Sequence, residues 1–424
     1  MKPAVYCVFS VLLLNGSLPA APFKAGNIAV CRVGSGSGAL QNSATAVFID
    51  EYSPVGVLVQ SIALPTAVNG SQRRLTASGT AVSEGSIQLS SDRKVLTLAG
   101  YDANPGTATI ASTSSGIVNR TVAFVEADGT IDTSTAVTSF NGQNIRSAVS
   151  SDGTGAWLCG GNSGIIYVPR SNGLASTTVS FTSASNRSVD IFGGQLYLSS
   201  GSGTLRIGSV GSGLPRLTGA SIQTVPGGPG TAADPYQFVM FDLDPAVAGL
   251  DTLYTADDTE ITGGIQKYAL VNGSWILRGN VGASGTLANI RGLTGQAAGT
   301  VVTLYAANAA RLVTLTDSSG YNGNVSGSPI LVATAPANTV FRGVDFAPVA
   351  SMTVEPPPTL SVAANATTVT VAWPSPSAGW TLQQTASLAT GTWVASTGIL
   401  DDGSVKRLVL TALAGRLFFR LAKL

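Results

Sequence analysis

Short apolar strands repeated along the chain are the feature that most restricts its fold. From 26 to 346 they alternate with turns rich in Gly, Asn, Asp and Ser, and they group in fours at a spacing of about fifty residues. A unit of this size cannot bury its apolar face alone, so it must stack against its neighbours. Six segments could each begin a group: "EGSIQLSSD" at 84, "RSAVSSDG" at 146, "RSVDIFGG" at 187, "QFVMFDLD" at 237, "RGLTGQ" at 291 and "RGVDFAP" at 342.

The last of these segments lies within "NTVFRGVDFAPV" at 338–349 and has no partner strands after it. Three strands without a preceding partner open the chain between 27 and 64: "NIAVCRVG", "TAVFIDEY" and "GVLVQSIALP". We therefore expect 341–346 to be the innermost strand of the group whose outer strands come first. The result is an all-β, six-bladed β-propeller closed by its C-terminal strand, without the open edges of a linear sheet. Seven blades remain an alternative if 65–83 hides further strands.

A second, smaller domain follows the expected propeller at 21–349. The segment 350–358 contains three consecutive prolines and predicts a stiff, extended linker. From 359 to 424 five or six short alternating strands predict a small β-sandwich of the fibronectin or immunoglobulin-like sort. Trp373, Trp380 and Trp393 in this part could stack on sugar rings. We favour the interpretation that they fill the core, because so small a domain needs large apolar side chains there.

The first twenty residues predict an export signal. Lys2 is followed by an apolar run from Ala4 to Leu14, with a plausible cleavage site between Ala20 and Ala21. The run is too short to span a bilayer, and no later segment is long and apolar enough to do so. We therefore expect a protein that is secreted or held at the cell surface.

Two cysteines remain after the expected cleavage, Cys31 and Cys159. A disulfide is one interpretation for an exported chain. The strand groups place the two residues in non-adjacent blades, however. We therefore favour two buried free thiols, which behave as small apolar side chains.

Composition excludes several classes of function. Lysine and arginine exceed aspartate and glutamate by 23 − 22 = 1, and this balance argues against nucleic-acid binding. The chain contains no histidine, so it has no Ser-His-Asp triad and no histidine metal site. We expect a monomer that uses no cofactor.

Two turns resemble those of known propeller repeats. The turns in "LSSDRKVLTLAG" and "VSSDGTGAWLCGG" resemble the Ser-x-Asp-Gly hairpin of bacterial propellers, including the lactonase-like and surface-layer types. The segments "WTLQQTASLATGTWV" and "RLFFRLAKL" resemble terminal modules of exported bacterial proteins. The whole chain thus resembles a secreted bacterial β-propeller protein with a C-terminal fibronectin or immunoglobulin-like module. The resemblance implies a fold and carries no known active residues.

One position per strand group gives a candidate ligand-binding ring. The six residues at the inner-strand starts are Glu84, Arg146, Arg187, Gln237, Arg291 and Arg342. The long loops lie mostly at the same end of the blades, and long loops on a rigid scaffold often carry function. Four guanidiniums around one mouth would bind carboxylates, sulfates or phosphates through forked hydrogen bonds. Alternatively, the arginines pair with acids such as Asp190 and Asp345, or with loop carbonyls, and only tie blades together.

Carboxylates are the remaining candidates for catalysis. Asp257, Asp258 and Glu260 lie on the same face and could supply a glycosidase pair. The other interpretations are a solvated acidic loop, which we favour, or a calcium site. A sialidase-like site fits poorly, because "SSDGTGAW" at 150–157 departs from the sialidase box at two positions and falls at the wrong hairpin.

Two hypotheses of function therefore stand. The first is a binding or scaffold propeller, possibly for an acidic glycan or another surface partner. The second is a hydrolase or lyase that acts on acidic polysaccharide at the arginine-lined mouth. A pair of acids at glycosidase spacing would favour the second hypothesis. Arginines held in intramolecular pairs would favour the first.

Overall fold

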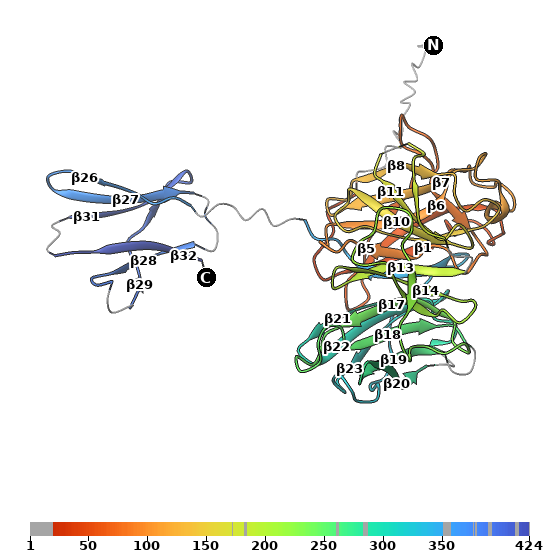
Figure 1. Ribbon diagram of the computed structural model, residues 1–424. Coiled ribbons are helices and arrows are strands. Elements are labelled where there is room, and N and C mark those ends of the chain that lie inside the picture. The colour runs from red at the N-terminus through yellow and green to blue at the C-terminus, as the bar shows by residue number, and fades with distance from the viewer. Residues whose placement is uncertain are drawn as a thin grey trace, which may run out of the picture. The chain divides into compact units, whose positions relative to one another are not determined.

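The computed structural model describes residues 20–424 except 172, 182–184, 260–262, 283–286, 351–357, 376, 378–379, 389–391, 412–414 and 424. The chain divides into two compact units, Met1–Ala350 and Ser351–Leu424 (Figure 1). The expected signal peptide, except for Ala20, and most of the expected linker lie outside the described residues. Within the described ranges, strands dominate, and η1 (Ile110–Ser112) is a short 3-10 turn between them.

The first unit is built from antiparallel sheets of short strands. Four sheets contain four consecutive strands each: β9 (Ile145–Val149), β10 (Gly155–Gly160), β11 (Ile165–Pro169) and β12 (Thr177–Ser180); β13 (Asn186–Phe192), β14 (Gln195–Ser200), β15 (Ile207–Val210) and β16 (Ile222–Thr224); β17 (Pro235–Phe241), β18 (Thr252–Asp257), β19 (Gly264–Val271) and β20 (Ser274–Val281); β21 (Gly292–Ala298), β22 (Val301–Ala307), β23 (Arg311–Asp317) and β24 (Ile330–Thr334). Figure 1 shows β17–β20 beside β21–β23.

The remaining strands of this unit form one nine-stranded sheet. It holds two antiparallel runs, β25–β1–β2–β3 and β5–β6–β7–β8, which are joined through β4. The strands are β1 (Ile28–Val33), β2 (Ala44–Tyr52), β3 (Leu58–Ala63), β4 (Thr76–Ser78), β5 (Ile87–Leu89), β6 (Val95–Tyr101), β7 (Arg120–Glu126), β8 (Ile131–Val137) and β25 (Val340–Phe346). The segment 65–83, suspected of hiding strands, contributes the three residues of β4, which bridge β2 and β6.

The inner strands of these groups follow one another around a closed cycle. Each inner strand contacts the next one in the order β5, β9, β13, β17, β21 and β25. β25 then contacts β5, which closes the cycle. A closed cycle of four-stranded antiparallel groups is a β-propeller. The all-β propeller predicted from the sequence is therefore confirmed.

The closing strand pairs the two ends of the propeller. β25 lies antiparallel to β1, with Ile28 opposite Phe346 and Val33 opposite Val340, and all six residues of β1 are buried. This pairing confirms the expected closure. The other side of β25 packs closely on β5, because a Cβ atom at Gly343 would lie 2.5 Å from the backbone nitrogen of Ile87. Glycine at 343 thus lets the last strand reach its neighbour.

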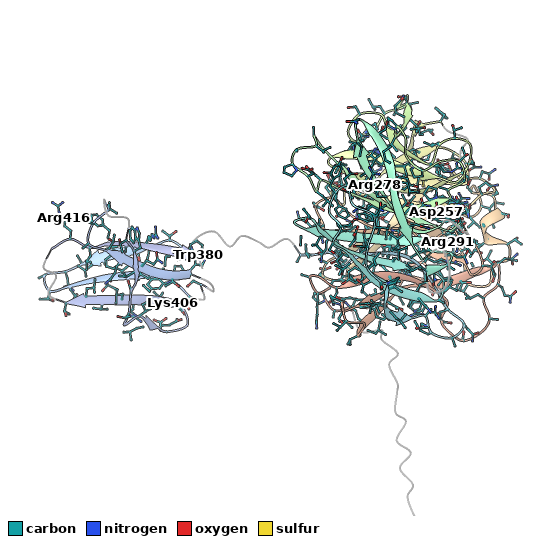
Figure 2. All side chains as sticks on the ribbon, turned by 90° about the horizontal axis from the view of Figure 1, so that it is seen from below. Asp257, Arg278, Arg291, Trp380, Lys406 and Arg416 are labelled. Atoms are coloured by element: carbon teal, nitrogen blue, oxygen red, sulfur yellow. The ribbon has the colours of Figure 1, made fainter. Side chains whose placement is uncertain are left out.

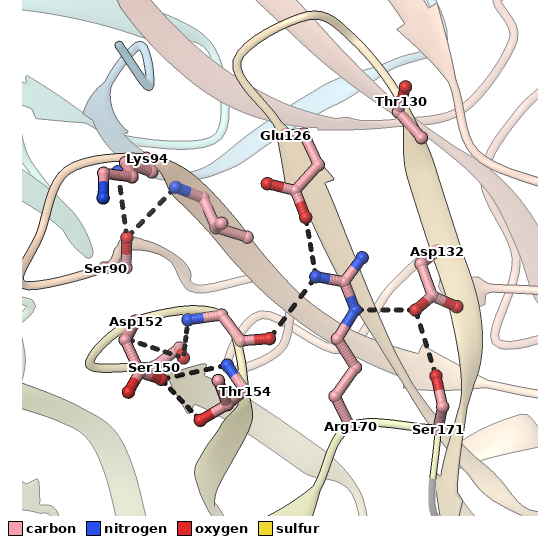
Figure 3. Close-up of polar contacts among 12 residues, drawn as sticks. Ser90, Lys94, Glu126, Thr130, Asp132, Ser150, Asp152, Thr154, Arg170 and Ser171 are labelled. Atoms are coloured by element: carbon pink, nitrogen blue, oxygen red, sulfur yellow. Dashed lines mark hydrogen bonds and ion pairs between the residues drawn. The ribbon is translucent and has the colours of Figure 1, made fainter. Parts of the chain in front are cut away.

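The two Ser-x-Asp turns form the hairpins that the sequence predicts (Figure 3). The Ser90 hydroxyl oxygen accepts the backbone N–H of Lys94 at 3.1 Å. In the equivalent turn, the Asp152 carboxylate accepts the backbone N–H of Thr154 at 2.9 Å. Short polar side chains that bond to nearby backbone groups stabilise tight turns in this way.

Arg170 ties neighbouring groups together beside the second turn. It follows β11 and donates to Glu126 at 2.6 Å and to Asp132 at 2.7 Å, so one guanidinium links β11 to β7 and β8 (Figure 3). Arg170 therefore links neighbouring blades through ion pairs. The same structural role is the alternative interpretation of the arginines of the candidate site.

The two thiols are buried and free, as expected. Cys31 and Cys159 form no disulfide, and burial raises the pKa of each thiol to about 12. Such thiols are not nucleophiles at neutral pH. They fill space in two different apolar clusters of the propeller core.

The second unit contains two small antiparallel sheets. One has the order β26–β27–β31–β30 and the other β29–β28–β32. The strands are β26 (Ser361–Ala364), β27 (Thr368–Pro374), β28 (Trp380–Thr385), β29 (Val394–Ala395), β30 (Leu400–Asp401), β31 (Val405–Thr411) and β32 (Phe418–Lys423). Trp373 is buried among Val371, Leu382 and Leu408, as the core interpretation predicts, whereas Trp380 and Trp393 are half-buried.

Candidate functional site

The candidate ring residues do gather at one end of the propeller channel. Five of the six line a single small cavity of about 20 Å³: Glu84, Arg187, Gln237, Arg291 and Arg342. We call this end the arginine mouth. Arg146 is not among the lining residues. A cavity of this volume is close to the smallest space that holds one water molecule, and it is far too small for a sugar ring.

Arg187 is held by an ion pair. Its guanidinium donates to both carboxylate oxygens of Asp234, at 2.8 and 3.2 Å, and lies over the ring of Tyr236, 4.6 Å from the ring centre. Asp234 comes from the loop directly before β17, in the next group along the chain. The pair therefore joins neighbouring groups with the geometry that makes arginine–carboxylate bonds strong.

Arg291 repeats this arrangement with the same Tyr236. It binds Asp258 at 2.7 Å, and its guanidinium lies 5.3 Å from the centre of the same tyrosine ring. Figure 2 labels Arg291, together with Asp257 and the more distant Arg278 of β20. Neither Asp234 nor Asp258 was predicted as an arginine partner.

The two carboxylates of these ion pairs also interact with each other. Burial raises the pKa of Asp234 to about 6, and the charge of Asp258 and a hydrogen bond to it add to the shift, while Arg187 opposes it. A shared proton relieves the repulsion between two such close carboxylates. The result is a chain of charges that runs from Arg187 through Asp234 and Asp258 to Arg291.

Arg146 and Arg342 differ from the other two arginines, because they form no ion pair among the described residues. Arg146 donates to the hydroxyl of Ser185 at 2.6 Å and to the carbonyl of Asn186 at 3.0 Å. Arg342 donates to the carbonyl of Gly79 at 3.1 Å, and its Nε has no described partner. Burial lowers the pKa of both guanidiniums.

Glu84 is a buried acid beside these cations. Its carboxylate accepts the Tyr101 hydroxyl at 2.6 Å and the backbone N–H of Ser78 at 2.8 Å. Burial raises its pKa to about 7, although these hydrogen bonds and the charges of Arg342 and Arg146 oppose the shift. Glu84 therefore titrates near neutral pH.

Gln237 closes the channel instead of lining an open site. Its amide nitrogen donates to the carbonyls of Ile87 and Val344 and to the Gln88 side chain, and its amide oxygen accepts the Val344 N–H at 3.0 Å. Gln88 continues across the channel and donates to Ser188 at 2.8 Å. We call these two residues the glutamine plug. A buried amide with every group bonded is structural.

Two acids proposed as arginine partners lie elsewhere. Asp190 and Asp345 line a separate cavity at the opposite ends of the inner strands, so the expected pairing is wrong. A strand rises about 3.3 Å per residue, which places an acid three residues after Arg187 or Arg342 about 10 Å further along. The suggested carbonyl partners are confirmed for Arg146 and Arg342.

The interpretation of Asp257 and Asp258 as part of a solvated acidic loop is wrong. Asp257 is fully buried and accepts the backbone N–H groups of Asp234 and Thr259, both at 2.9 Å, while Asp258 belongs to the ion pair with Arg291. Glu260 lies outside the described residues. Within the described ranges, no three acid, cysteine or histidine side chains gather closely enough to hold a metal ion.

Comparisons with known proteins find similarity in structure alone. The chain matches no protein-family model and no curated protein sequence. Among solved structures it is similar to a periplasmic gluconolactonase of Pseudomonas aeruginosa (13% identity, TM-score 0.41, 92% of this chain and 99% of that one). It is also similar to a Lactobacillus plantarum protein (10%, TM-score 0.42, 91% and 100%) and to a virginiamycin B lyase of Staphylococcus aureus (10%, TM-score 0.38, 89% and 94%).

Because the identities and TM-scores are low, the fold assignment is based on the strand pairing and not on these similarities. In the described part of the chain, no helix is long and apolar enough to cross a membrane.

Proposed function

We propose that the protein is an exported, non-catalytic binding propeller that takes the acidic group of a surface polymer at its arginine mouth. One observation carries this proposal. Three of the four inner-strand arginines line one cavity at this end of the channel, and Arg342 and Arg146 form no ion pair in the described structure. Their hydrogen bonds go to neutral groups, and burial raises the pKa of the neighbouring Glu84 to about 7, so these buried guanidiniums favour a further anion nearby.

The size of the cavity limits what enters it. About 20 Å³ accommodates a single carboxylate or sulfate oxygen, whereas the rest of the ligand would have to lie on the long-loop face outside. An acidic glycan has this character, because its charged groups project from a neutral chain. The predicted N-terminal export signal and the second unit, proposed as a spacer or attachment module, fit a protein that works outside the cytoplasm.

The pair of acids at this mouth does not favour the hydrolase hypothesis. A retaining glycosidase separates its two carboxyl groups by roughly 5 Å and an inverting enzyme by more. Asp234 and Asp258 instead hydrogen-bond each other, and each is already bound to an arginine. Both carboxylates are therefore engaged with an arginine, and this does not favour a role as catalytic acid or base.

A glycan-array screen of the mature chain, with product analysis of every hit, tests the proposal. Arg291→Ala should weaken binding of an acidic glycan by about 1.5–3 kcal/mol, the contribution of a charge-assisted hydrogen bond. Raised salt should weaken binding further. The matched control is Arg278→Ala, which removes the same charge from the outer strand β20 and should bind normally.

We expect Arg291→Ala to lower the stability of the protein as well as its binding. Because Arg291 binds Asp258, its loss leaves a partly buried carboxylate unpaired. The double variant Arg291→Ala/Asp258→Asn removes that effect and isolates ligand binding. Cleaved glycan products would support the hydrolase hypothesis instead. If the wild-type chain binds no acidic ligand and Arg291→Ala unfolds the protein, the arginines are purely structural.

A further inference from the structure

The opposite end of the propeller channel holds a second, larger cavity. Its volume is about 230 Å³, and its walls come from the far ends of the inner strands β5, β13, β17, β21 and β25. We call it the acid mouth, after Asp190 and Asp345. The glutamine plug lies between the two mouths, since Gln237 lines the first cavity and lies on β17 before Val239 of the second.

The two acids of this mouth have different surroundings. Asp345 accepts three hydrogen bonds, from the backbone N–H groups of Leu89 and Phe346 and the hydroxyl of Thr294, each at 2.7 Å. Within the described structure, Asp190 accepts one hydrogen bond, from the N–H of Ile191 at 2.7 Å. A carboxylate has about four acceptor positions, so Asp190 keeps most of its capacity for a group in the cavity.

The other walls are apolar. Phe192, Val239, Met240 and Phe241 line the cavity from β13 and β17, and Phe346 lines it from β25. A mostly apolar pocket with a few convergent polar groups is the usual form of a small-molecule site. Because this cavity is smaller than the roughly 300–1,000 Å³ of pockets for drug-sized ligands, it suits a fragment-sized molecule.

Three charged or titratable groups line this mouth. Asp190 and Asp345 come from β13 and β25, while the exposed Arg93 follows β5 and lies over the Phe346 ring. Burial raises the pKa of both acids, and the charge of Asp345 raises that of Asp190 well above its ordinary value. The remaining walls, from β17 and β21, carry no charge. Burial, together with the charge of Asp345, therefore raises the pKa of Asp190 and favours its protonated form when no cation is in the cavity.

We propose that the acid mouth binds a small primary amine, with the ammonium group on Asp190 and an apolar body against Phe192, Met240 and Phe241. A metal ion fits less well, because calcium needs six to eight oxygen ligands and Asp345 already accepts three hydrogen bonds. A neutral apolar molecule would leave the Asp190 carboxyl without a partner. An ammonium ion supplies both charge and hydrogen-bond donors.

Phenethylamine and its neutral counterpart 2-phenylethanol test this proposal by calorimetry on the full chain. The amine should bind at least about tenfold more tightly than the alcohol, a difference of about 1.4 kcal/mol. Because the pKa of Asp190 is raised in the empty cavity, binding of the ammonium group should also release a proton, seen as a heat that changes with the ionisation enthalpy of the buffer. Because this comparison uses the wild-type protein, it does not depend on how any variant folds.

Two matched variants complete the experiment. Asp190→Asn should reduce amine binding at least about tenfold, to the level of the alcohol, and abolish the proton release. Asp128→Asn, the same change at an exposed turn, should leave both unchanged. Equal binding of amine and alcohol to the wild type, or no amine binding up to millimolar concentration, would overturn the proposal. The same holds for tight amine binding by Asp190→Asn.

Discussion

The two ends of one channel show how the same strands can build opposite electrostatic surfaces. At the arginine mouth, several cations surround very little free space. Arg187 and Arg291 form ion pairs with loop acids, and the cavity is about the size of one water molecule. At the acid mouth, Asp190 remains under-bonded beside a cavity about ten times larger. The difference teaches that the residues most visible in the sequence repeat are not those with the most room for a ligand.

Deletion of 338–349 should have the largest effect, because it removes a wall from both mouths at once. β25 supplies Arg342 to one end and Asp345 to the other, and it covers the fully buried strand β1. We expect aggregation or loss of the cooperative melting transition, since an apolar sheet edge becomes exposed. Circular dichroism and size-exclusion chromatography measure both.

The control for this deletion is a chain that ends at 350. It lacks the second compact unit and should keep a folded propeller. If the chain without 338–349 were instead monomeric and melted normally, closure by the last strand would not hold the propeller together.

Removal of the glutamine plug should have the next largest effect, because it breaks the separation between the mouths. Gln237→Leu leaves the N–H and carbonyl of Val344 and the carbonyl of Ile87 without their bonds. We expect a loss of about 2–4 kcal/mol in the free energy of unfolding, from several buried polar groups left unsatisfied. Urea denaturation measures it.

Gln223→Leu, the same change on the exposed strand β16, is the matched control and should shift stability by no more than about 0.5 kcal/mol. Equal effects of the two substitutions would mean that the plug contributes nothing to the fold.

The pH dependence of stability sharpens the comparison at the arginine mouth. The pKa of Glu84 is raised from its ordinary 4.5 to about 7 in the folded protein, so folding favours the protonated acid. Its stabilising contribution is complete below about pH 4.5 and is lost as the pH rises through about 7. Glu84→Gln should therefore flatten the fall in melting temperature between pH 5 and pH 8. Parallel melting curves for variant and wild type across this range would contradict the assignment.

Arg93 at the acid mouth should show the smallest effect. Its side chain is exposed and has no described ion pair, and its main contact is with the Phe346 ring. Arg93→Ala should change the free energy of unfolding by no more than about 0.5 kcal/mol. Arg342→Ala, by contrast, removes a buried guanidinium from the other mouth and should cost more. If Arg93→Ala lowered the free energy of unfolding more than Arg342→Ala, the burial of these two side chains would not explain their contributions to stability.

Sequence reasoning predicted the scaffold well because strand period, turn residues and an unpartnered last strand are local signals. It also predicted that Arg187, Arg291 and Arg342 share one end, since each begins an inner strand. It could not predict their partners. Asp234 and Asp258 lie 47 and 33 residues from the arginines they bind, and such pairs form only after blades stack.

The acid mouth was missed for a different reason. Asp190 was interpreted as a partner for arginine, whereas its distance along the strand from Arg187 already placed it towards the other end of the channel. Counting the rise per residue along each inner strand would have separated the two mouths. The cavity itself has no sequence signal, because its walls of Phe192, Met240 and Phe241 look like any other buried strand residues.

The pairing of β1 with β25 also sets the order in which this chain can fold. Ile28 meets Phe346 across 346 − 28 = 318 residues, so the first strand must wait for almost the whole propeller to emerge before its partner exists. Contacts between such distant residues are slow to form. During that interval β1, whose six residues are all buried in the finished ring, presents an apolar edge on which other chains can nucleate aggregation. A protein closed in this way depends on completing its synthesis faster than its first strand finds a wrong partner.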